Sequence, residues 1–276
     1  MRRIWPLCAV IVTVSCAPLP PIPFVTDADV SPPVITSLGF AGPLALEIGF
    51  NEPARVVGDP IVSAGVVLEE TVQEVDAVLA FRFEHPPSAA EEHTIEAQVA
   101  DEAGNHLRFL AHFHGLNALM PAMIINEFTT QGSGSHPDLV EIRVLTDGNL
   151  AGATLYEGTP TNWEQRYVFP DLDVVAGDYL VVHFRPEGLP EEVDELVDRT
   201  ASGGFDATPE GWDFWVSGGS GLSGYNGAIT LCENPLGGYL DAVLCSNRTS
   251  ASDEHYRGFG SRDVMERADE LAAAGA

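Results

Sequence analysis

The stretch HTIEAQVADEAGNHLRFLAHF, residues 93–113, decides the fold of the first half of this chain. It consists of two runs in which apolar and polar residues alternate, separated by the turn pair Gly104-Asn105. The apolar positions are Ile95, Ala97 and Val99 in the first run and Leu107, Phe109, Ala111 and Phe113 in the second. Strict alternation places one face of a strand in a core, and Gly-Asn accepts the backbone angles of a tight turn. The stretch therefore predicts an antiparallel hairpin with one buried face.

The same period of two recurs on the N-terminal side of this hairpin. PLALEIGF, residues 43–50, places Leu44, Leu46, Ile48 and Phe50 on one face, and AVLAFRFEH, residues 77–85, does so with Leu79, Phe81 and Phe83. Half-buried strands bounded by Gly, Pro, Asn and Asp are typical of β-sandwiches. We expect residues 31–116 to form one small sandwich domain.

This segment resembles the bacterial Ig-like domains. The similarity rests on a proline-led strand, PPVITSLGF, on a turn of the FSEPV type in LALEIGFNEPARVVG, and on the closing DEAGN hairpin. The resemblance implies an immunoglobulin-like sandwich and a structural role for these motifs.

A short link, NALMPA at residues 117–122, leads to a second unit that resembles the lamin-tail domain of bacterial surface and secreted proteins. The similarity is carried by MIINEF, DLVEIRV, AGDYLVVHF and the pair of runs AITLCENPLGGYLDAVLCSN. The Asn that usually follows the second of these strands in the family, here DLVEIRV, is replaced near Val144. The resemblance implies a second immunoglobulin-like sandwich over residues 123–249, a binding or scaffolding role, and no chemistry. The predicted fold class is all-β, with two sandwiches in tandem.

The N-terminus has the features of an export signal. Arg2 and Arg3 precede a nearly continuous apolar run from Ile4 to Val14, which as a helix covers roughly 16 Å and is too short for an ordinary membrane span. Thr13-Val14-Ser15-Cys16 resembles the lipobox of bacterial lipoproteins, in which the cysteine is acylated and becomes the new N-terminus. We expect residues 1–15 to be a signal peptide, Cys16 to carry a lipid anchor, and the proline-rich residues 16–30 to form an extended tether. The alternative is a soluble secreted protein in which Cys16 is incidental.

The chain is strongly acidic. Its formal net charge is −28, and loss of residues 1–15 removes two arginines and no acid, so the charge becomes −30. It contains no lysine, which excludes lysine Schiff bases and P-loop lysines. The large excess of acidic side chains argues against nucleic-acid or anionic-lipid partners, which need a cationic surface.

Two helices are predicted outside the strands. LPEEVDELVDRT has a proline at a first helical position followed by two glutamates, which favours a short helix beginning at Pro190. In the C-terminal segment, residues 250–276, Ser261 is a candidate N-cap. It precedes an apolar stripe made of Val264, Met265, Ala268, Leu271 and Ala272.

Aromatic residues near a glycine-rich stretch make the favoured recognition patch. They are Trp212, Phe214, Trp215 and Tyr225 in EGWDFWVSGGSGLSGYNG. Exposed aromatic rings can stack on sugars or peptides. If residues 212–215 form a strand, alternation places Trp212 and Phe214 on one face and Trp215 on the other, so that one set is core.

A calcium site is a second hypothesis. Glu127, Asp138 and Glu141 surround the polar loop TTQGSGSHPD and could supply oxygen ligands to Ca²⁺, or could cap strand ends. No other cofactor is expected. A paired-carboxylate hydrolase would use the same acids, but no cleft residues accompany them.

Two further patterns are interpreted as structural. Gly219, Gly221 and Gly224 give a literal GxGxxG, but a strand and not a helix is expected next, so dinucleotide binding is excluded. His106, His112 and His114 share a face with Arg108, and we interpret them as solvent-facing strand histidines.

The two remaining cysteines are predicted to be unbonded. If ENPLGG is the turn between the last two strands, Cys232 lies opposite about Tyr239, and Cys245 is then about 20 Å further along. We expect no disulfide.

The sequence therefore predicts a noncatalytic, exported protein of the bacterial cell envelope, periplasmic or surface-facing. It would be held at the membrane by its lipid and would bind an unknown protein or glycan through loops of the second domain. The alternatives are a carbohydrate-binding module, or an accessory part of a secreted hydrolase or nuclease.

Overall fold

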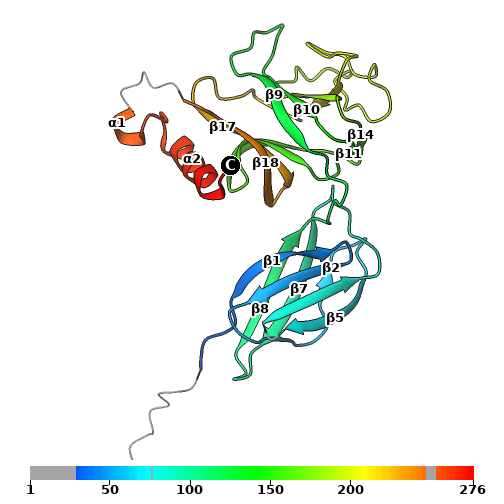
Figure 1. The fold of residues 1–276 in the computed structure, drawn as a ribbon, viewed down its shortest axis with the longest axis vertical. Helices are drawn as coiled ribbons and strands as arrows, with labels where there is room; N and C mark the ends of the chain where they lie inside the picture. The colour runs from blue at the N-terminus through cyan, green and yellow to red at the C-terminus, as the bar shows by residue number, and fades with distance from the viewer. Residues whose placement is uncertain (1–28, 76, 247–252) are drawn as a thin grey trace, which may run out of the picture.

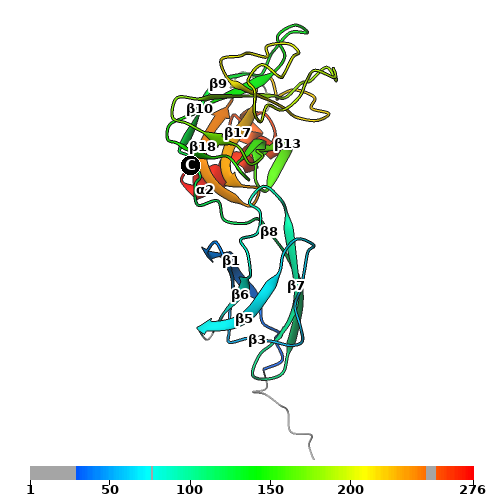
Figure 2. The same cartoon turned by 90° about the vertical axis from the view of Figure 1, so that its right-hand side faces the viewer.

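The computed structural model describes residues 29–75, 77–246 and 253–276. They form two β-sandwich domains in tandem, with β1–β8 in the first and β9–β18 in the second (Figures 1 and 2). A short C-terminal helix packs on the second domain. The all-β, two-sandwich fold class is thus confirmed.

The first domain pairs its strands in antiparallel fashion. One sheet has the order β1-β2-β6-β5, and in the other β7 lies between β3 or β4 on one side and β8 on the other. The strands are β1 Ile35–Gly42, β2 Ala45–Phe50, β3 Arg55–Val56, β4 Ile61–Val62, β5 Leu68–Val75, β6 Val78–Phe83, β7 His93–Ala100 and β8 His106–Phe113.

The core of the first domain follows the alternation in the sequence. The hairpin of residues 93–113 forms as predicted, with Ile95 paired to Ala111 and Ala97 to Phe109. The buried apolar side chains include Leu46, Ile48, Phe50, Leu79, Phe81, Phe83, Ile95, Ala97, Val99, Phe109 and Phe113. Leu44 is the exception, since it lies in the turn before β2 and is 43% exposed.

The second domain has two four-stranded sheets, β16-β15-β10-β9 and β13-β12-β17-β18, and a small ladder of β11 with β14. Its core contains Val140, Ile142, Leu155, Phe169, Leu180, Val182, Phe214 and Leu231. The strands are β9 Met123–Thr129, β10 Leu139–Val144, β11 Gly148–Asn149, β12 Thr154–Thr159, β13 Asn162–Val168, β14 Asp173–Val174, β15 Tyr179–His183, β16 Trp212–Trp215, β17 Gly227–Asn234 and β18 Gly237–Cys245.

The C-terminal helix α2, Arg262–Ala274, covers the outer face of the sheet that contains β12 and β17 (Figure 1). Ser261 is its N-cap, as predicted, and its hydroxyl accepts a hydrogen bond from the Val264 amide at 3.3 Å. A one-turn helix, α1 Asp253–Tyr256, precedes it. Val264, Ala268 and Leu271 are buried against the sheet.

Polar contacts also hold α2 in place. Glu270 accepts hydrogen bonds from the hydroxyls of Thr159 and Tyr239, and the buried Arg267 donates to the Asn162 carbonyl. Burial tends to raise the pKa of Glu270, but these hydrogen bonds lower it below its ordinary value. The helix therefore completes the second domain.

The short helix predicted from Pro190 does not form, and residues 190–200 run through turns and bends. The reason is that acidic side chains of this segment bond to backbone amides. The Glu192 carboxylate, for example, accepts from the amides of Glu187, Gly188 and Leu189. Such local side-chain contacts compete with a helical ladder.

The connection between the domains is fixed by specific contacts. The side-chain Nδ2 of Asn117 donates hydrogen bonds to the backbone carbonyls of Asn149 at 2.8 Å and of Ala151 at 2.9 Å. Gly152 has φ +85°, and a Cβ on it would lie 2.4 Å from the Ala89 carbonyl oxygen of the first domain. A glycine is therefore required at this contact.

Among the residues that the structure describes, no helix has the length and apolar character needed to span a bilayer. The expected signal peptide, Cys16 and most of the tether lie outside the described residues.

Candidate functional site

The candidate site is built on the long connection between β15 and β16, residues 184–211. These two strands pair in parallel, with Leu180 opposite Trp212 and His183 opposite Trp215. Parallel neighbours need a crossover, which is usually a helix. Here the crossover is an irregular loop, which we call the crossover loop.

Two buried acids fix the middle of the crossover loop. Glu195 and Asp213 are each 1% exposed. Glu195 accepts hydrogen bonds from the amides of Ser202 at 3.0 Å and Asp213 at 2.9 Å, while Asp213 accepts one from the Thr208 amide at 2.8 Å. These carboxylates take the place of the hydrogen bonds that a helix would supply.

His183 lies beneath the loop and is fully buried. Its Nε2 donates to Asp213 Oδ1 at 2.8 Å, and its ring stacks on Trp215 with centroids 3.9 Å apart. Its Nδ1 has no hydrogen-bond partner within the described residues. A His–Asp pair occurs in catalytic triads, but here Trp215 covers the ring, and the pair serves to hold β15, β16 and the loop together.

Asp194 and Arg199 attach the two ends of the same segment. Asp194 accepts from the Trp215 amide at 2.8 Å and from the Tyr167 hydroxyl at 2.7 Å. Burial, and then the nearby charge of Asp194, raises the pKa of Tyr167, so its hydroxyl remains a donor. Arg199 bonds to Asp178 at 2.7 Å, and its guanidinium lies 4.6 Å from the centre of the Trp212 ring.

The opposite side of this firmly attached segment carries apolar side chains. Val193 is 41%, Leu196 48% and Val197 92% exposed. We call these three residues the apolar loop surface. Sequence reasoning missed it because a short helix was predicted over this segment, and that helix does not form.

A polar groove of about 320 Å³ lies beside the loop, on the outer face of the sheet that contains β15. Its lining includes Asn126, Glu141, Tyr179, Thr208 and Glu210. Asn126 donates to Glu141 at 2.6 Å, which orients the carboxylate. The groove offers hydroxyl, amide and carboxylate groups beside one aromatic ring.

The predicted aromatic patch is mostly core. Alternation is correct, because Trp212 and Phe214 pack on the central cluster and Trp215 lies on the other face. However, Phe214 is 0% and Trp215 7% exposed, so the prediction that they contact a ligand is wrong. The crossover loop covers the second face, which a period-of-two argument cannot detect. Tyr225 is 63% exposed and is not part of this cluster.

The three calcium candidates do not converge. Glu127 and Glu141 are opposite each other on β9 and β10, but Asp138 is buried elsewhere and accepts from the amides of Gly132 at 2.7 Å and Leu222 at 2.8 Å. Asp138 ties two loops together. The alternative interpretation, in which these acids hydrogen-bond the backbone at strand ends and loops, accounts for Asp138.

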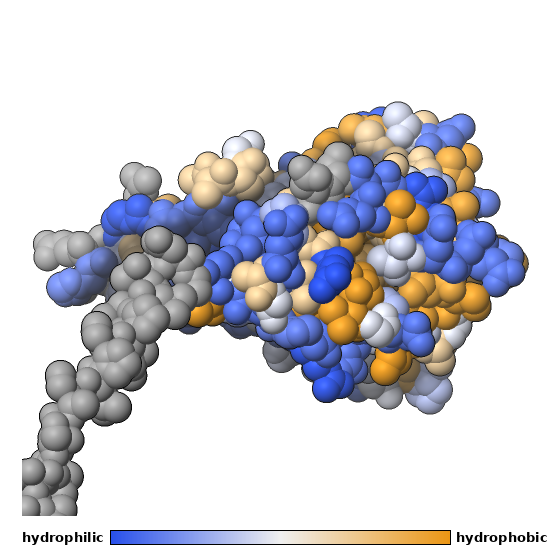
Figure 3. Space-filling view, turned by 90° about the horizontal axis from the view of Figure 1, so that it is seen from below, coloured by the Kyte–Doolittle hydropathy of each residue, from blue (hydrophilic) through white to orange (hydrophobic). Residues whose placement is uncertain are grey.

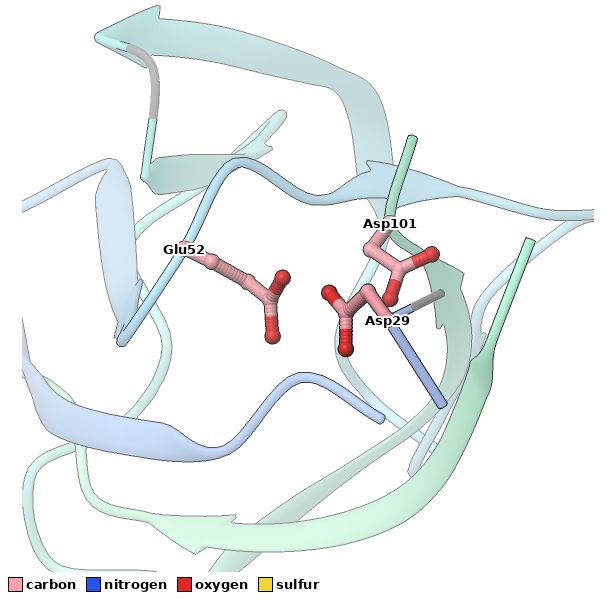
Figure 4. Close-up of side chains that lie close together, drawn as sticks. All are labelled: Asp29, Glu52 and Asp101. Carbon is pink, nitrogen blue, oxygen red and sulfur yellow. The ribbon is translucent and has the colours of Figure 1, made fainter. Parts of the chain in front are cut away.

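Three other carboxylates do meet, at the end of the first domain far from the second. Ligand oxygens of Asp29, Glu52 and Asp101 lie within 4.8 Å of one another and could hold a metal ion (Figure 4). Asp101 already accepts from the amide and side chain of Asn105, each at 2.8 Å. Burial alone raises the pKa of Asp101, and these bonds lower it below its ordinary value. Acidic residues in the NEP and DEAGN turns were the available signal for this cluster.

The same end of the molecule carries hydrophobic residues in separate groups among hydrophilic ones (Figure 3). Of the strand histidines, His106 and His112 are exposed as predicted. His114 is 8% exposed, so its assignment to solvent is wrong, because it follows the end of β8 where the chain turns toward the second domain. The glycine-rich stretch leads into strand β17, as predicted.

Cys232 and Cys245 are both free. The register prediction is confirmed, since Cys232 pairs with Tyr239 and Cys245 with Gly227 on the facing strand. Burial raises the pKa of Cys232 to about 12.

The fold and site define a two-domain β-sandwich protein with a fixed irregular crossover. Residues 121–276 match the TP_1001_2nd family, described as a protein second domain, and this match covers more than half of the chain. The chain therefore belongs to that family.

An uncharacterized protein of Treponema pallidum (strain Nichols) is 28% identical over 179 residues, which is 64% of this chain and 45% of the relative. The chain thus spans less than half the length of that relative. A DUF4876 family protein from Bacteroides thetaiotaomicron VPI-5482 is 12% identical, covering 72% of this chain and 76% of that one, with a TM-score of 0.29. The LD transpeptidase LdtMt1 in complex with imipenem is 11% identical, covering 67% and 91%, with a TM-score of 0.18. Neither structural likeness carries an argument about function.

Proposed function

We propose that this protein is a noncatalytic, lipid-anchored protein of the bacterial cell envelope. In this proposal the second, lamin-tail-like domain binds a partner protein through the apolar loop surface. The single observation that carries the binding role is the exposure of Val193, Leu196 and Val197 on a loop that buried carboxylates hold in place.

The crossover loop is already fixed in the unbound protein. A flexible loop must lose conformational freedom when it binds, which weakens affinity, whereas a loop that is already fixed avoids most of that cost. Asp194 and Glu195 lie between Val193 and Leu196 in the sequence. Their carboxylates accept hydrogen bonds from the backbone amides of Trp215, and of Ser202 and Asp213, respectively. Removing exposed apolar side chains from water when a partner binds favours association.

A noncatalytic role is supported by what the buried polar groups do. His183, Asp213 and Glu195 bond to one another or to backbone amides, and Asp138 ties two loops together. Each of these groups thus has a structural task. The acidic net charge of −28 supports a partner other than nucleic acid.

A photo-crosslinking amino acid in place of Val197 tests the proposal in intact bacterial cells. We expect one discrete adduct that is reduced when Val193 and Leu196 are changed to serine. Val67, which is 52% exposed on the first domain, is the matched control position. The same adducts from both positions, or none from Val197, would refute binding through this surface.

Labelling with a palmitate analogue tests the anchor separately. The full chain should incorporate the label into the membrane fraction, and Cys16→Ser should not. Equal labelling of both would remove the anchor from the proposal.

Glycan binding is a second candidate, and the polar groove favours it. Tyr179 offers a ring on which a sugar can stack, and Asn126 and Glu141 offer hydrogen-bond partners. A glycan array probed with the wild type and Tyr179→Ala tests this candidate. No glycan signal from the wild type, or one that Tyr179→Ala leaves unchanged, would eliminate the groove.

A further inference from the structure

Two buried imidazoles hold the loop of residues 86–90, at the end of the first domain that meets the second. His93 is 4% and His114 8% exposed. His93 Nε2 lies 3.1 Å from the Ser88 carbonyl oxygen, and His114 Nδ1 lies 3.2 Å from the Ala89 carbonyl oxygen. A carbonyl only accepts, so each of these ring nitrogens carries a proton and donates a hydrogen bond. The two rings therefore fix successive carbonyls of this loop.

This loop packs closely against the second domain and against the chain that leads to it. A Cβ on Gly152 of the second domain would overlap the Ala89 carbonyl, and a Cβ on Gly115 would overlap the Pro87 carbonyl. The Gly115 amide also donates to the Ser88 carbonyl at 2.9 Å. The position of the loop therefore decides whether the two domains stay docked at this point.

The chain passes from the first domain to the second through residues 115–116 (Figure 2). Asn117, the next residue, is attached to the second domain, because its side-chain Nδ2 donates to the carbonyls of Asn149 and Ala151. Residues 115–116 thus lie between an attachment to the first domain and an attachment to the second. They have the position of a hinge, which the loop contact keeps closed.

A proton on His114 is incompatible with this closed arrangement. In the neutral ring Nδ1 donates to Ala89, and Nε2 is a buried acceptor without a hydrogen-bond partner within the described residues. Protonation turns Nε2 into a buried donor and gives the ring a positive charge, and both are costly without a partner. Burial accordingly lowers the pKa of His114 below its ordinary value of 6.5. The charged ring is stabilised when the segment opens and water reaches it.

The charged groups around this ring do not offset its burial. Arg166 on β13 and His93 at the start of β7 disfavour a positive charge on it, whereas Glu92 favours one. Glu92 is half exposed and already pairs with His112 of β8 at 2.9 Å. Glu233 of β17, which lines the same space between the domains, is exposed, so water and salt screen its charge.

We propose that the junction between the domains is an acid-sensitive hinge. At neutral pH His114 holds the loop of residues 86–90, and the contact of Ala89 with Gly152 keeps the domains docked. In acid the charged ring leaves the loop, the contact opens, and the domains turn about residues 115–116. A group with a lowered pKa in the docked state stabilises docking above its ordinary pKa and loses this effect as the pH falls below it. The hinge does not depend on the partner proposed for the apolar loop surface.

The test compares hydrogen exchange of the full chain at about pH 7.5 and about pH 5, read by mass spectrometry and corrected for the intrinsic rate at each pH. Peptides that contain Gly115 should lose protection by about tenfold or more in acid, because its amide leaves the Ser88 carbonyl. Peptides from the core strands β7 and β10 should keep their protection. Small-angle X-ray scattering should show a larger radius of gyration at the lower pH.

Three variants separate the hinge from other effects of acid. His114→Gln keeps a side-chain donor for the Ala89 carbonyl but cannot gain a charge, so both acid responses should be lost. Arg166→Gln removes a cation that disfavours the charged ring, so the response should begin at a higher pH. This variant tests the hinge even if His114→Gln does not fold. His106→Gln is the matched control, because His106 is an exposed imidazole on the same strand, and it should respond as the wild type does.

Four results would overturn the proposal. The first is equal protection of Gly115 in the wild type at both pH values. The second is an acid response of His114→Gln like that of the wild type, and the third is an unchanged response of Arg166→Gln. The fourth is loss of protection in β7 and β10 together with Gly115, since this would show unfolding of the domains and not movement at a hinge.

Discussion

Glu195→Ala is expected to destabilise the second domain and to loosen the crossover loop. The carboxylate is 1% exposed and accepts hydrogen bonds from the amides of Ser202 and Asp213. Alanine leaves both donors without their acceptor, at roughly 1–3 kcal/mol for each buried group. Water can reach Ser202 more readily, because that residue is only partly buried. We therefore expect a loss of about 2–4 kcal/mol in the free energy of unfolding.

Two measurements check this prediction. Urea unfolding followed by tryptophan fluorescence gives the free energy of unfolding. Trp215 reports on the altered site, because its Nε1 donates to the Ser202 hydroxyl beside that site. Hydrogen exchange read by mass spectrometry should show faster exchange in peptides that contain Ser202 and Asp213. Glu187→Ala, an exposed acid at the start of the same loop, is the control and should change stability by less than about 0.5 kcal/mol. A loss below that value for Glu195→Ala would mean that the buried carboxylate does not hold the loop.

Leu271→Ala in α2 should lower the free energy of unfolding by about 2–4 kcal/mol, because the side chain is packed against the sheet and is 5% exposed. Ala273→Ser, at an exposed position of the same helix, is the control and should change the free energy of unfolding little. Equal urea midpoints for the two variants would show that the helix is not docked. Burial raises the pKa of Cys232 to about 12, so iodoacetamide at about pH 8 should alkylate the half-buried Cys245 first. The order of alkylation is measured by mass spectrometry, and the reverse order would contradict the burial of Cys232. Burial alone raises the pKa of Asp178, but hydrogen bonds from Val175 and Arg199 lower it below its ordinary value of 3.8. The ionised carboxylate therefore stabilises the fold at pH values above 3.8, and this stabilisation is lost as the pH falls through the lower pKa of the folded state. Asp178→Asn should thus reduce the difference in unfolding free energy between about pH 6 and pH 2, and an unchanged difference would refute the assignment.

The sandwich folds could be predicted because their determinants are local. Each strand buries one face, so the alternation at Phe81 and Phe83 or at Ile95 and Ala97 is already visible in the sequence. The register of Cys232 with Tyr239 was predictable for the same reason, since a short turn fixes which residues lie opposite.

The site could not be predicted because its determinants are distant in sequence. Pro190 and the two glutamates that follow it favour a short helix. Bonds that Glu192 and Glu195 accept from backbone amides override this preference. Trp215 alternates like an exposed residue, yet a loop that begins some thirty residues earlier covers it. The carboxylates of Asp29, Glu52 and Asp101 come from three separate segments, which no single motif joins.

The placement of the two ends of the first domain has a mechanical consequence. Asp29 lies beside the β7–β8 turn. This turn is at the end of the first domain opposite to the one from which the chain leads into the second domain (Figure 2). Tension applied between those ends runs roughly parallel to the strands, so the ladder from Ile35–Phe50 to Gly42–Ala45 is loaded in shear and many hydrogen bonds must break together. A sandwich pulled in this direction resists stretching far better than one whose strands peel apart singly.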